Sequence, residues 1–210
     1  IFKIKFINPM KNILTYFVLP VIVVLLGYLV YKSLRAPIEF NQAKAYREQI
    51  AIERLKDIRT LQTAYKTKYG KYTASFDTLL NFYNNDHITL VRQIGSMDDS
   101  IAVAQKRVFR DSIKIAVRDT LLKRPGFIID SIQYIPFSGK QKFEMKAIVA
   151  KVSGVNVPLF EACAPYDLLL KGLNRQYVVN LNYERTSSDR YPGLKVGSID
   201  APNNNAGNWE

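Results

Sequence analysis

The N-terminal part of the chain contains a long apolar run. Residues 13–31, ILTYFVLPVIVVLLGYLVY, are 19 positions without a charge. At about 1.5 Å per residue, a helix of this length spans roughly 30 Å, the thickness of a bilayer's hydrocarbon core. The run predicts a transmembrane helix over 13–34, behind a basic tail, residues 1–12. A cleaved signal peptide is the competing interpretation, but its apolar region is usually about 7–15 residues long and ends at a small-residue cleavage site, which is missing here.

Several positions in the run fit a membrane environment. Tyr16 lies near one end, and Tyr28 and Tyr31 lie near the other, where aromatic side chains favour the two interfaces. Pro20 is expected to bend or loosen the first turns, because proline lacks a backbone N–H. The run has no ionisable residue, so it cannot supply a proton-carrying carboxylate inside the membrane.

A second helix is predicted over residues 38–69, which contain neither glycine nor proline. Its apolar positions follow alternating steps of four and three, and Gly70 provides a natural C-terminal stop. Two interpretations remain open: the stripe packs against the chain's own domain, or it forms a coiled-coil stalk with a partner chain. The stripe comprises Ala51, Leu55, Ile58, Gln62, Tyr65 and Tyr69, widened by Leu61.

The pattern after residue 70 predicts an α+β domain over 70–200. A short helix capped by Ser75 comes first, with an apolar face of Phe76, Leu79, Leu80 and Tyr83. The period then shifts towards two, which predicts a mainly antiparallel sheet. The expected strands begin at His87 and at Ile113 and then cover 128–135, 142–152, 155–160 and 177–183, with a hairpin turn at Ser153–Gly154 and a short helix at 167–173. Residues 201–210 are expected to form a surface tail.

Composition and charge predict how the chain is oriented across the membrane. The hydrophobic share of 48% permits a packed core, and the net charge is +12. The tail carries three lysines and no acid, whereas Lys32 and Arg35 lead into Glu39 and Glu48. The positive-inside tendency therefore places the tail in the cytoplasm and the domain on the outer side of the membrane. In a Gram-negative cell, this predicts a helix in the inner membrane and a domain in the periplasm.

The residues available for catalysis or metal binding predict a non-enzymatic protein without cofactor or metal. His87 and Cys163 are the only histidine and cysteine, so no Cys/His metal cluster or internal disulfide can form. We expect His87 at the surface and Cys163 to be a buried thiol. An anchored hydrolase is the alternative if acids such as Asp98, Asp99, Asp119 and Asp130 meet in a cleft. Lysines and tyrosines alternate over 65–72, but a helix stripe with membrane-facing charge explains them better than nucleic-acid binding does.

One segment resembles a known family. Residues 45–82, with the core DIRTLQTAYKTKYGKY at 57–72, resemble the end of the long helix in type II secretion pseudopilins and type IV pilins. There, a membrane helix continues into an amphipathic stretch that stops at a glycine. The chain departs from the family at the processing site, where pilins carry Gly before Phe-Thr-x-x-Glu. Here the region reads Asn8–Pro9–Met10–Lys11–Asn12, and the apolar run has no glutamate.

The overall layout is also similar to uncharacterised single-pass envelope proteins of Gram-negative bacteria. The shared segments are the KDIR helix, DSIQYIPF at 130–137 and YPGLKVGS at 191–198. This resemblance implies an accessory subunit of an ExbB/ExbD/TonB-type energy-transducing complex. The expected partners are membrane lipid, a multi-pass inner-membrane protein of a proton-channel complex, and periplasmic subunits. We expect partner contacts at Pro20, Gly27, Tyr28, Leu55, Ile58, Tyr65 and Tyr69.

Overall fold

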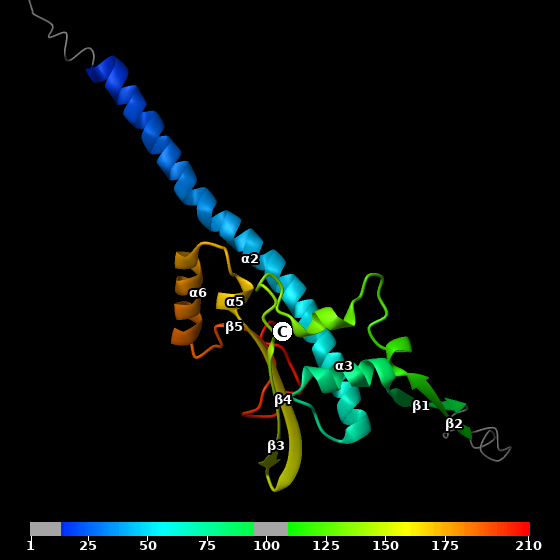
Figure 1. The fold of residues 1–210 in the computed structure, drawn as a ribbon. Coiled ribbons are helices and arrows are strands. Elements are labelled where there is room, and N and C mark those ends of the chain that lie inside the picture. Colours follow the sequence, from blue (N-terminus) through cyan, green and yellow to red (C-terminus); the bar gives the residue numbers. More distant parts are fainter. Residues whose placement is uncertain (1–13, 95–108) are drawn as a thin grey trace, which may run out of the picture. The chain divides into compact units, whose positions relative to one another are not determined.

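The computed structural model describes residues 14–94 and 109–210. The predicted tail, residues 1–12, and the acids Asp98 and Asp99 lie outside the described residues. The chain divides into two compact units, unit 1 to Tyr46 and unit 2 from Arg47 to Glu210. Figure 1 gives the order of the elements along the chain. The fold is α+β, with a long N-terminal helix and two antiparallel sheets.

The two helices expected at 13–34 and 38–69 are one helix in the structure. A π-helical turn, η1 (Leu14–Val18), leads into α2 (Leu19–Tyr69), and Pro37 lies inside α2. A proline removes one backbone hydrogen bond, and helix-favouring sequence on both sides lets the helix continue. Pro20 is the second residue of α2, where the hydrogen-bond pattern changes from π to α. Gly70 ends the helix as predicted, with φ +72°.

The core of unit 2 is built on the predicted stripe of α2. Ala51, Leu55, Ile58 and Leu61 have no exposed surface. Gln62 is also fully buried, and its amide bonds both backbone groups of Thr73, donating to the carbonyl at 2.6 Å and accepting from the N–H at 3.1 Å. The interpretation that the stripe packs against its own domain is therefore confirmed for these positions.

Helix α3 (Phe76–Asn85) starts at Ser75, whose hydroxyl accepts from the Thr78 N–H as predicted. Its buried residues are Phe76, Leu79 and Phe82; the expected Leu80 and Tyr83 are only half-buried. Strands β1 (His87–Ile94) and β2 (Phe109–Ala116) follow and pair antiparallel, in agreement with the period-two pattern. A 3₁₀ turn, η2 (Val117–Asp119), then buries Val117.

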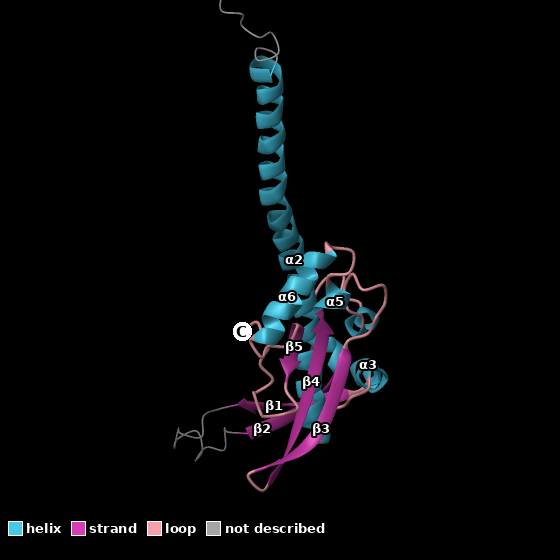
Figure 2. Cartoon of the chain, turned by 90° about the vertical axis from the view of Figure 1, so that its left-hand side faces the viewer, coloured by secondary structure: helices cyan, strands magenta, loops and turns pink. Residues whose placement is uncertain are grey.

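The larger sheet has the order β3 (Glu144–Val152), β4 (Val155–Pro165) and β5 (Gly193–Gly197), all antiparallel (Figure 2). Ser153 and Gly154 form the predicted two-residue turn, both with positive φ, as a type I′ turn requires. The second half of β4 is buried, Cys163 included, which confirms the prediction for this thiol. β5 was not predicted, since it is short and flanked by glycines.

Two predicted strands are wrong. Residues 128–135 contain a 3₁₀ helix, η3 (Ile129–Gln133), whose buried residues are the adjacent Ile132 and Gln133. Two adjacent buried side chains do not fit the alternation of a strand. Residues 177–183 belong to α6 (Arg175–Ser187), which follows the short helix α5 (Tyr166–Leu169). The Asn174 side chain caps α6 by accepting from the Gln176 N–H, and such a cap favours a helix where alternation alone is ambiguous.

The C-terminal residues 201–210 are mostly exposed, as expected of a surface tail, but they are attached to unit 2. Gly207 forms a β-bridge with Val196 of β5. The Asn205 amide donates to the Tyr72 hydroxyl at 2.9 Å, and Arg59 of α2 pairs with Glu210 at 2.7 Å. This tail therefore covers one edge of the larger sheet, while β3 forms the other edge.

Candidate functional site

The first candidate is the apolar part of α2 in unit 1. None of its most apolar 18-residue window is buried in the structure. A core helix of a soluble domain would be mostly buried, whereas this one is apolar on all sides and has no protein cover. By length and composition it is able to cross a membrane. Its exposed aliphatic residues include Val21, Ile22, Val23, Val24, Leu25, Leu26, Leu29 and Val30.

Three of the predicted partner residues lie on one face of this segment. Pro20, Gly27 and Tyr28 follow the spacing i, i+7 and i+8, which is one stripe of an α-helix. Tyr28 is 59% exposed, and a Cβ placed on Gly27 would meet nothing within 4 Å. A glycine in such a stripe lets the backbone of a second helix approach closely. The structure leaves this face of the segment exposed.

A charged cluster bounds the apolar run. The Arg35 guanidinium donates to Glu39 at 2.6 Å and to the Tyr31 hydroxyl at 2.8 Å. An arginine held beside a tyrosine at the end of an apolar helix suits the interface between lipid and water.

The other predicted partner residues lie in unit 2 and are mostly buried. Leu55 and Ile58 have no exposed surface, and Tyr65 is 8% exposed. Tyr65 packs edge-on against Phe82 of α3, with ring centroids 5.4 Å apart. The core of unit 2 thus occupies these three side chains. Of the four, only Tyr69 is exposed, at 46%.

Tyr69 belongs to a polar cluster at the end of α2. Its hydroxyl donates to Asp86 at 2.6 Å, and the Lys68 ammonium pairs with the same carboxylate at 2.7 Å. The hydrogen bond from Lys68, and then that from Tyr69, lowers the pKa of Asp86. The cluster joins α2 to the C-terminal end of α3, and this role is structural.

Sequence reasoning missed one ion pair, in which a buried carboxylate meets an exposed arginine. Asp57 of α2 is 4% exposed and accepts two hydrogen bonds from Arg124, one of them at 3.1 Å. Burial raises the pKa of Asp57, and the Arg124 guanidinium opposes that shift. Nearby, Arg54 donates to the Tyr134 carbonyl at 2.5 Å. The sequence indicated that Asp57 would be buried and need a partner, because Asp57 lies between Leu55 and Ile58 of the apolar stripe. The pair fixes the segment around Arg124 to α2.

The two described acids proposed for a hydrolase, Asp119 and Asp130, and the further acid Glu161 are placed on separate elements. Asp119 ends η2, Asp130 lies in η3, and Glu161 of β4 pairs with Lys195 at 3.1 Å. Within residues 14–94 and 109–210, no three His, Cys, Asp or Glu side chains are grouped to hold a metal ion. His87 begins β1, and burial raises the pKa of the Cys163 thiol to about 12, which keeps it protonated and unreactive at neutral pH.

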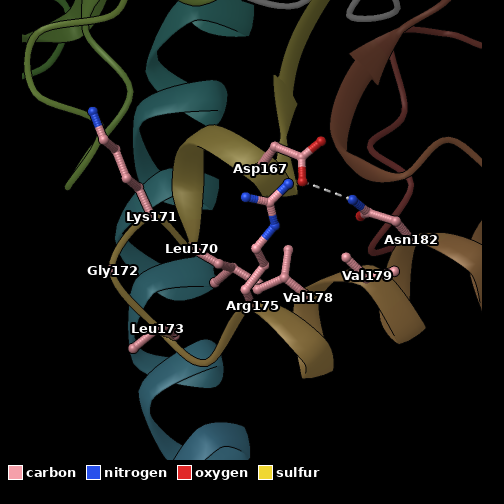
Figure 3. A pocket seen from close by; sticks show the side chains of 9 residues that line it. All are labelled: Asp167, Leu170, Lys171, Gly172, Leu173, Arg175, Val178, Val179 and Asn182. Atoms are coloured by element: carbon pink, nitrogen blue, oxygen red, sulfur yellow. Dashed lines mark hydrogen bonds between the residues drawn. The ribbon is translucent and has the colours of Figure 1, made fainter.

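An open groove of about 580 Å³ lies between α5, α6 and their connecting loop (Figure 3). In it, the Asn182 amide donates to Asp167 at 2.9 Å, and the Arg175 guanidinium extends toward the same carboxylate. Lys171 points away from this pair, and Leu170 and Val178 supply apolar lining. The polar part of the lining consists of Asp167, Lys171, Arg175 and Asn182, so the groove is suited to contact with charged groups.

Comparison of the chain with protein-family models, curated proteins and solved structures found no match. The case for function therefore rests on the chain's own residues.

Proposed function

We propose that this chain is a non-enzymatic, single-pass inner-membrane subunit that holds a periplasmic domain as an accessory or scaffold in a multiprotein envelope complex. The observation that carries the proposal is the apolar part of α2, whose side chains are exposed over its most apolar 18 residues. Such a surface requires lipid or another membrane helix, because apolar area is unfavourable in water. Unit 2 has its own buried core and needs no membrane to satisfy its apolar residues.

The membrane partner in this proposal packs on the face of Pro20, Gly27 and Tyr28. Because the apolar run has no ionisable residue, the helix would stand beside a proton path and not within it. The resemblance to single-pass envelope proteins points to an ExbB/ExbD/TonB-type machine as the complex. The scaffold role agrees with the polar sites of unit 2, where Asp57 is neutralised by Arg124 and Asp86 by Lys68.

The test is co-purification at native expression level in mild detergent, with mass spectrometry of the chains recovered. The expected result is a multi-pass membrane protein in constant ratio to this chain. The double variant Gly27→Leu with Tyr28→Leu, which blocks close approach at position 27 and removes the ring at position 28, should lose that partner. The matched control, Ile22→Phe with Leu29→Phe, adds bulk to the opposite face and should retain it. Recovery of a monomer without a stable partner would contradict the proposal.

A pilin-like filament component is the second candidate. The observation that favours it is α2 itself, a 51-residue helix that stops at Gly70 in the manner of the pilin helix. This candidate requires N-terminal processing immediately before the apolar run, and the segment Asn8–Asn12 lacks the expected motif. Mass spectrometry of the mature N-terminus decides between the candidates, since a chain that retains the basic tail cannot be a processed pilin.

A further inference from the structure

The loop that precedes β3, residues 135–142, is held in one conformation by its own hydrogen bonds. The Ile135 N–H donates to the Gln141 carbonyl at 2.8 Å. The buried Ser138 hydroxyl donates to the Ile135 carbonyl at 2.7 Å and accepts from the Gln141 N–H at 3.0 Å. A loop whose backbone is already fixed loses little conformational entropy when it binds a partner.

This loop presents an aromatic ring at the surface. Phe137 is 46% exposed, and its φ of 62° is uncommon for a bulky residue. Backbone conformations of this kind are costly, and they cluster at binding and active sites. The Arg47 guanidinium lies over the ring, 4.7 Å from its centroid. The fold therefore maintains a partly exposed ring at a conformational cost.

An open pocket of about 310 Å³ adjoins the ring. Its lining includes Ile135, Pro136 and Phe137, and Lys140 also lines it. This volume is near the lower limit for ligand pockets, about 300 Å³. The pocket therefore suits one projecting apolar side chain better than a whole ligand.

Three exposed lysines belong to the same surface. Lys140 and Lys142 come from residues 135–142, and Lys171 comes from residues 168–176; neither segment contains Asp or Glu. None of the three lysines forms an ion pair with a residue that the structure describes. Their charges are therefore available to an acidic partner.

Specific contacts bring the two segments together. The Arg47 guanidinium, which lies over Phe137, also donates to the Lys171 carbonyl at 2.8 Å. A Cβ placed on Gly139 would lie 3.9 Å from the Lys171 ammonium nitrogen, so this cation reaches the first loop. All of these residues belong to unit 2. We call this surface the Phe137 patch, and it comprises Phe137, Lys140, Lys142 and Lys171.

We propose that the Phe137 patch docks an acidic segment of a partner protein. An apolar side chain of that segment enters the pocket, and carboxylates beside it pair with the three lysines. An apolar centre with a polar rim is the usual construction of a protein interface, and charge complementarity selects the partner. This inference rests on the proposed function, because it names the class of periplasmic partner that the scaffold would hold.

Charge and shape disfavour other occupants. A second copy of the chain carries the same net charge of +12 and would be repelled. A lipid surface or a soluble polyanion supplies phosphates for the lysines, but it brings no single apolar side chain to fill the pocket. A protein segment supplies both groups on adjacent residues, about 3.5 Å apart along an extended chain.

The test measures binding of a synthetic peptide to the full chain in uncharged detergent. The probe is fluorescein-labelled Glu-Asp-Glu-Phe-Glu-Asp-Glu, and fluorescence anisotropy reports its affinity. One matched peptide replaces Phe by Ser, and another replaces every acid by its amide. We expect the probe to bind at least about fivefold more tightly than either, because loss of an anchoring side chain weakens an interface by about that factor. Equal binding of the peptide without Phe would overturn the proposal in favour of a general anion, such as a lipid headgroup or a polyphosphate.

Charge reversal supplies matched variants of the chain. Both variants remove three exposed lysines, so a general attraction of a basic protein would affect them equally. Arg175 is left unchanged because it extends toward Asp167 (Figure 3). Each reversed charge of an exposed pair should change the affinity about two- to fivefold, so the patch variant should bind the probe roughly tenfold more weakly or worse, and the control should stay near wild type. The patch variant is Lys140→Glu, Lys142→Glu and Lys171→Glu; the control is Lys114→Glu, Lys123→Glu and Lys151→Glu.

Removal of the ring tests the apolar part of the site. Phe137→Asn deletes the ring and should retain the loop, because asparagine tolerates a positive φ. This variant should lose the preference for the probe over the peptide that carries Ser in place of Phe. The control, Tyr183→Asn, removes a ring that is 76% exposed on α6 and should keep the preference. A preference that survives in Phe137→Asn would overturn the assignment of the pocket.

The outcomes separate this inference from the proposed function. Peptide binding is measured on the isolated chain, whereas the proposed function is tested by co-purification of a multi-pass membrane protein. If no such protein co-purifies, the proposed function fails whatever the peptide does. If it co-purifies but the three peptides bind alike, or the two lysine variants weaken binding equally, only this inference is overturned.

Discussion

The two halves of α2 have similar backbones and opposite surroundings. Leu25 and Leu26 in unit 1 are each 55% exposed, whereas Leu55 and Leu61 in unit 2 have no exposed surface. The spacing of apolar residues makes the difference, because the first half is apolar all round and the second confines its apolar residues to a stripe. A stripe can be covered by one small domain. A helix that is apolar on every face needs a solvent that is itself apolar, and this comparison carries the membrane proposal.

The largest expected effect comes from charging the uncovered half. The double variant Val23→Arg with Leu26→Arg should prevent membrane insertion, since each arginine at the centre of a span costs about 2.5–3.5 kcal/mol on insertion scales. The measurement is the fraction of chain that stays with membranes after alkaline carbonate extraction. The control, Ile38→Arg with Tyr46→Arg, adds the same charge at exposed positions outside the apolar run and should remain inserted. Equal behaviour of the two variants would contradict the comparison.

The second-largest effect is expected from truncating one leucine in each half of α2 and comparing the stability of unit 2. Leu55→Ala removes a fully buried side chain and should lower the free energy of unfolding of unit 2 by about 2–5 kcal/mol. Leu25→Ala removes the same atoms from an exposed position of the same helix and should leave that free energy unchanged within about 0.5 kcal/mol. Urea unfolding of the full chain in detergent, followed by near-ultraviolet circular dichroism, measures both. Similar losses would mean that the halves are not distinct.

Substitution of one glycine in each unit should give a smaller difference in the stability of unit 2. Gly197 of β5 has φ +74°, and a Cβ there would overlap the carbonyl oxygen of Phe160. Gly197→Ala should therefore cost unit 2 about 1–3 kcal/mol through backbone strain, in the same unfolding experiment. Gly27→Ala places a methyl group in open space on a helix and should leave the stability of unit 2 unaltered. A tolerated Gly197→Ala would show that β5 can shift away from β4.

The smallest expected effect concerns the polar end of α2. The pKa of Asp86 is lower in the folded chain, because Lys68 and Tyr69 bind its carboxylate. Its contribution is thus present above the unfolded pKa, near pH 4, and is lost as the pH falls through the lowered value. Asp86→Asn should cost about 0.2–1 kcal/mol at pH 7, and that difference should disappear in acid. Asp200→Asn, in an exposed loop, is the control. A stability difference between wild type and Asp86→Asn that grows as the pH falls would contradict the prediction.

Much of the fold could be predicted because its patterns are long or carry a specific turn residue. The stripe of α2, the Ser75 cap and the Ser153–Gly154 turn each satisfy a local rule and appear in the structure. Errors arose where local rules conflict. Residues 177–183 alternate like a strand, and only the Asn174 cap and the burial of Val178 mark the helix.

The candidate sites depend on contacts that sequence spacing cannot supply. The exposed face of Pro20, Gly27 and Tyr28 follows from helical periodicity alone. The pairing of Asp57 with Arg124 joins residues 67 positions apart, and Arg47 binds the Lys171 carbonyl across 124 positions. Only the folded chain brings such groups together, so the ion pair and the hydrogen bonds of Arg47 were not predicted.

The central claim is that the apolar half of α2 crosses a membrane and leaves unit 2 on the far side from the tail. The direct measurement is labelling of intact spheroplasts with a membrane-impermeant maleimide, using single cysteines at Lys11→Cys in the tail and Asn204→Cys on the surface of unit 2. The account predicts that position 204 reacts in intact cells, that position 11 reacts only after lysis, and that the buried Cys163 reacts in neither case. Labelling of both positions from the same side would contradict it.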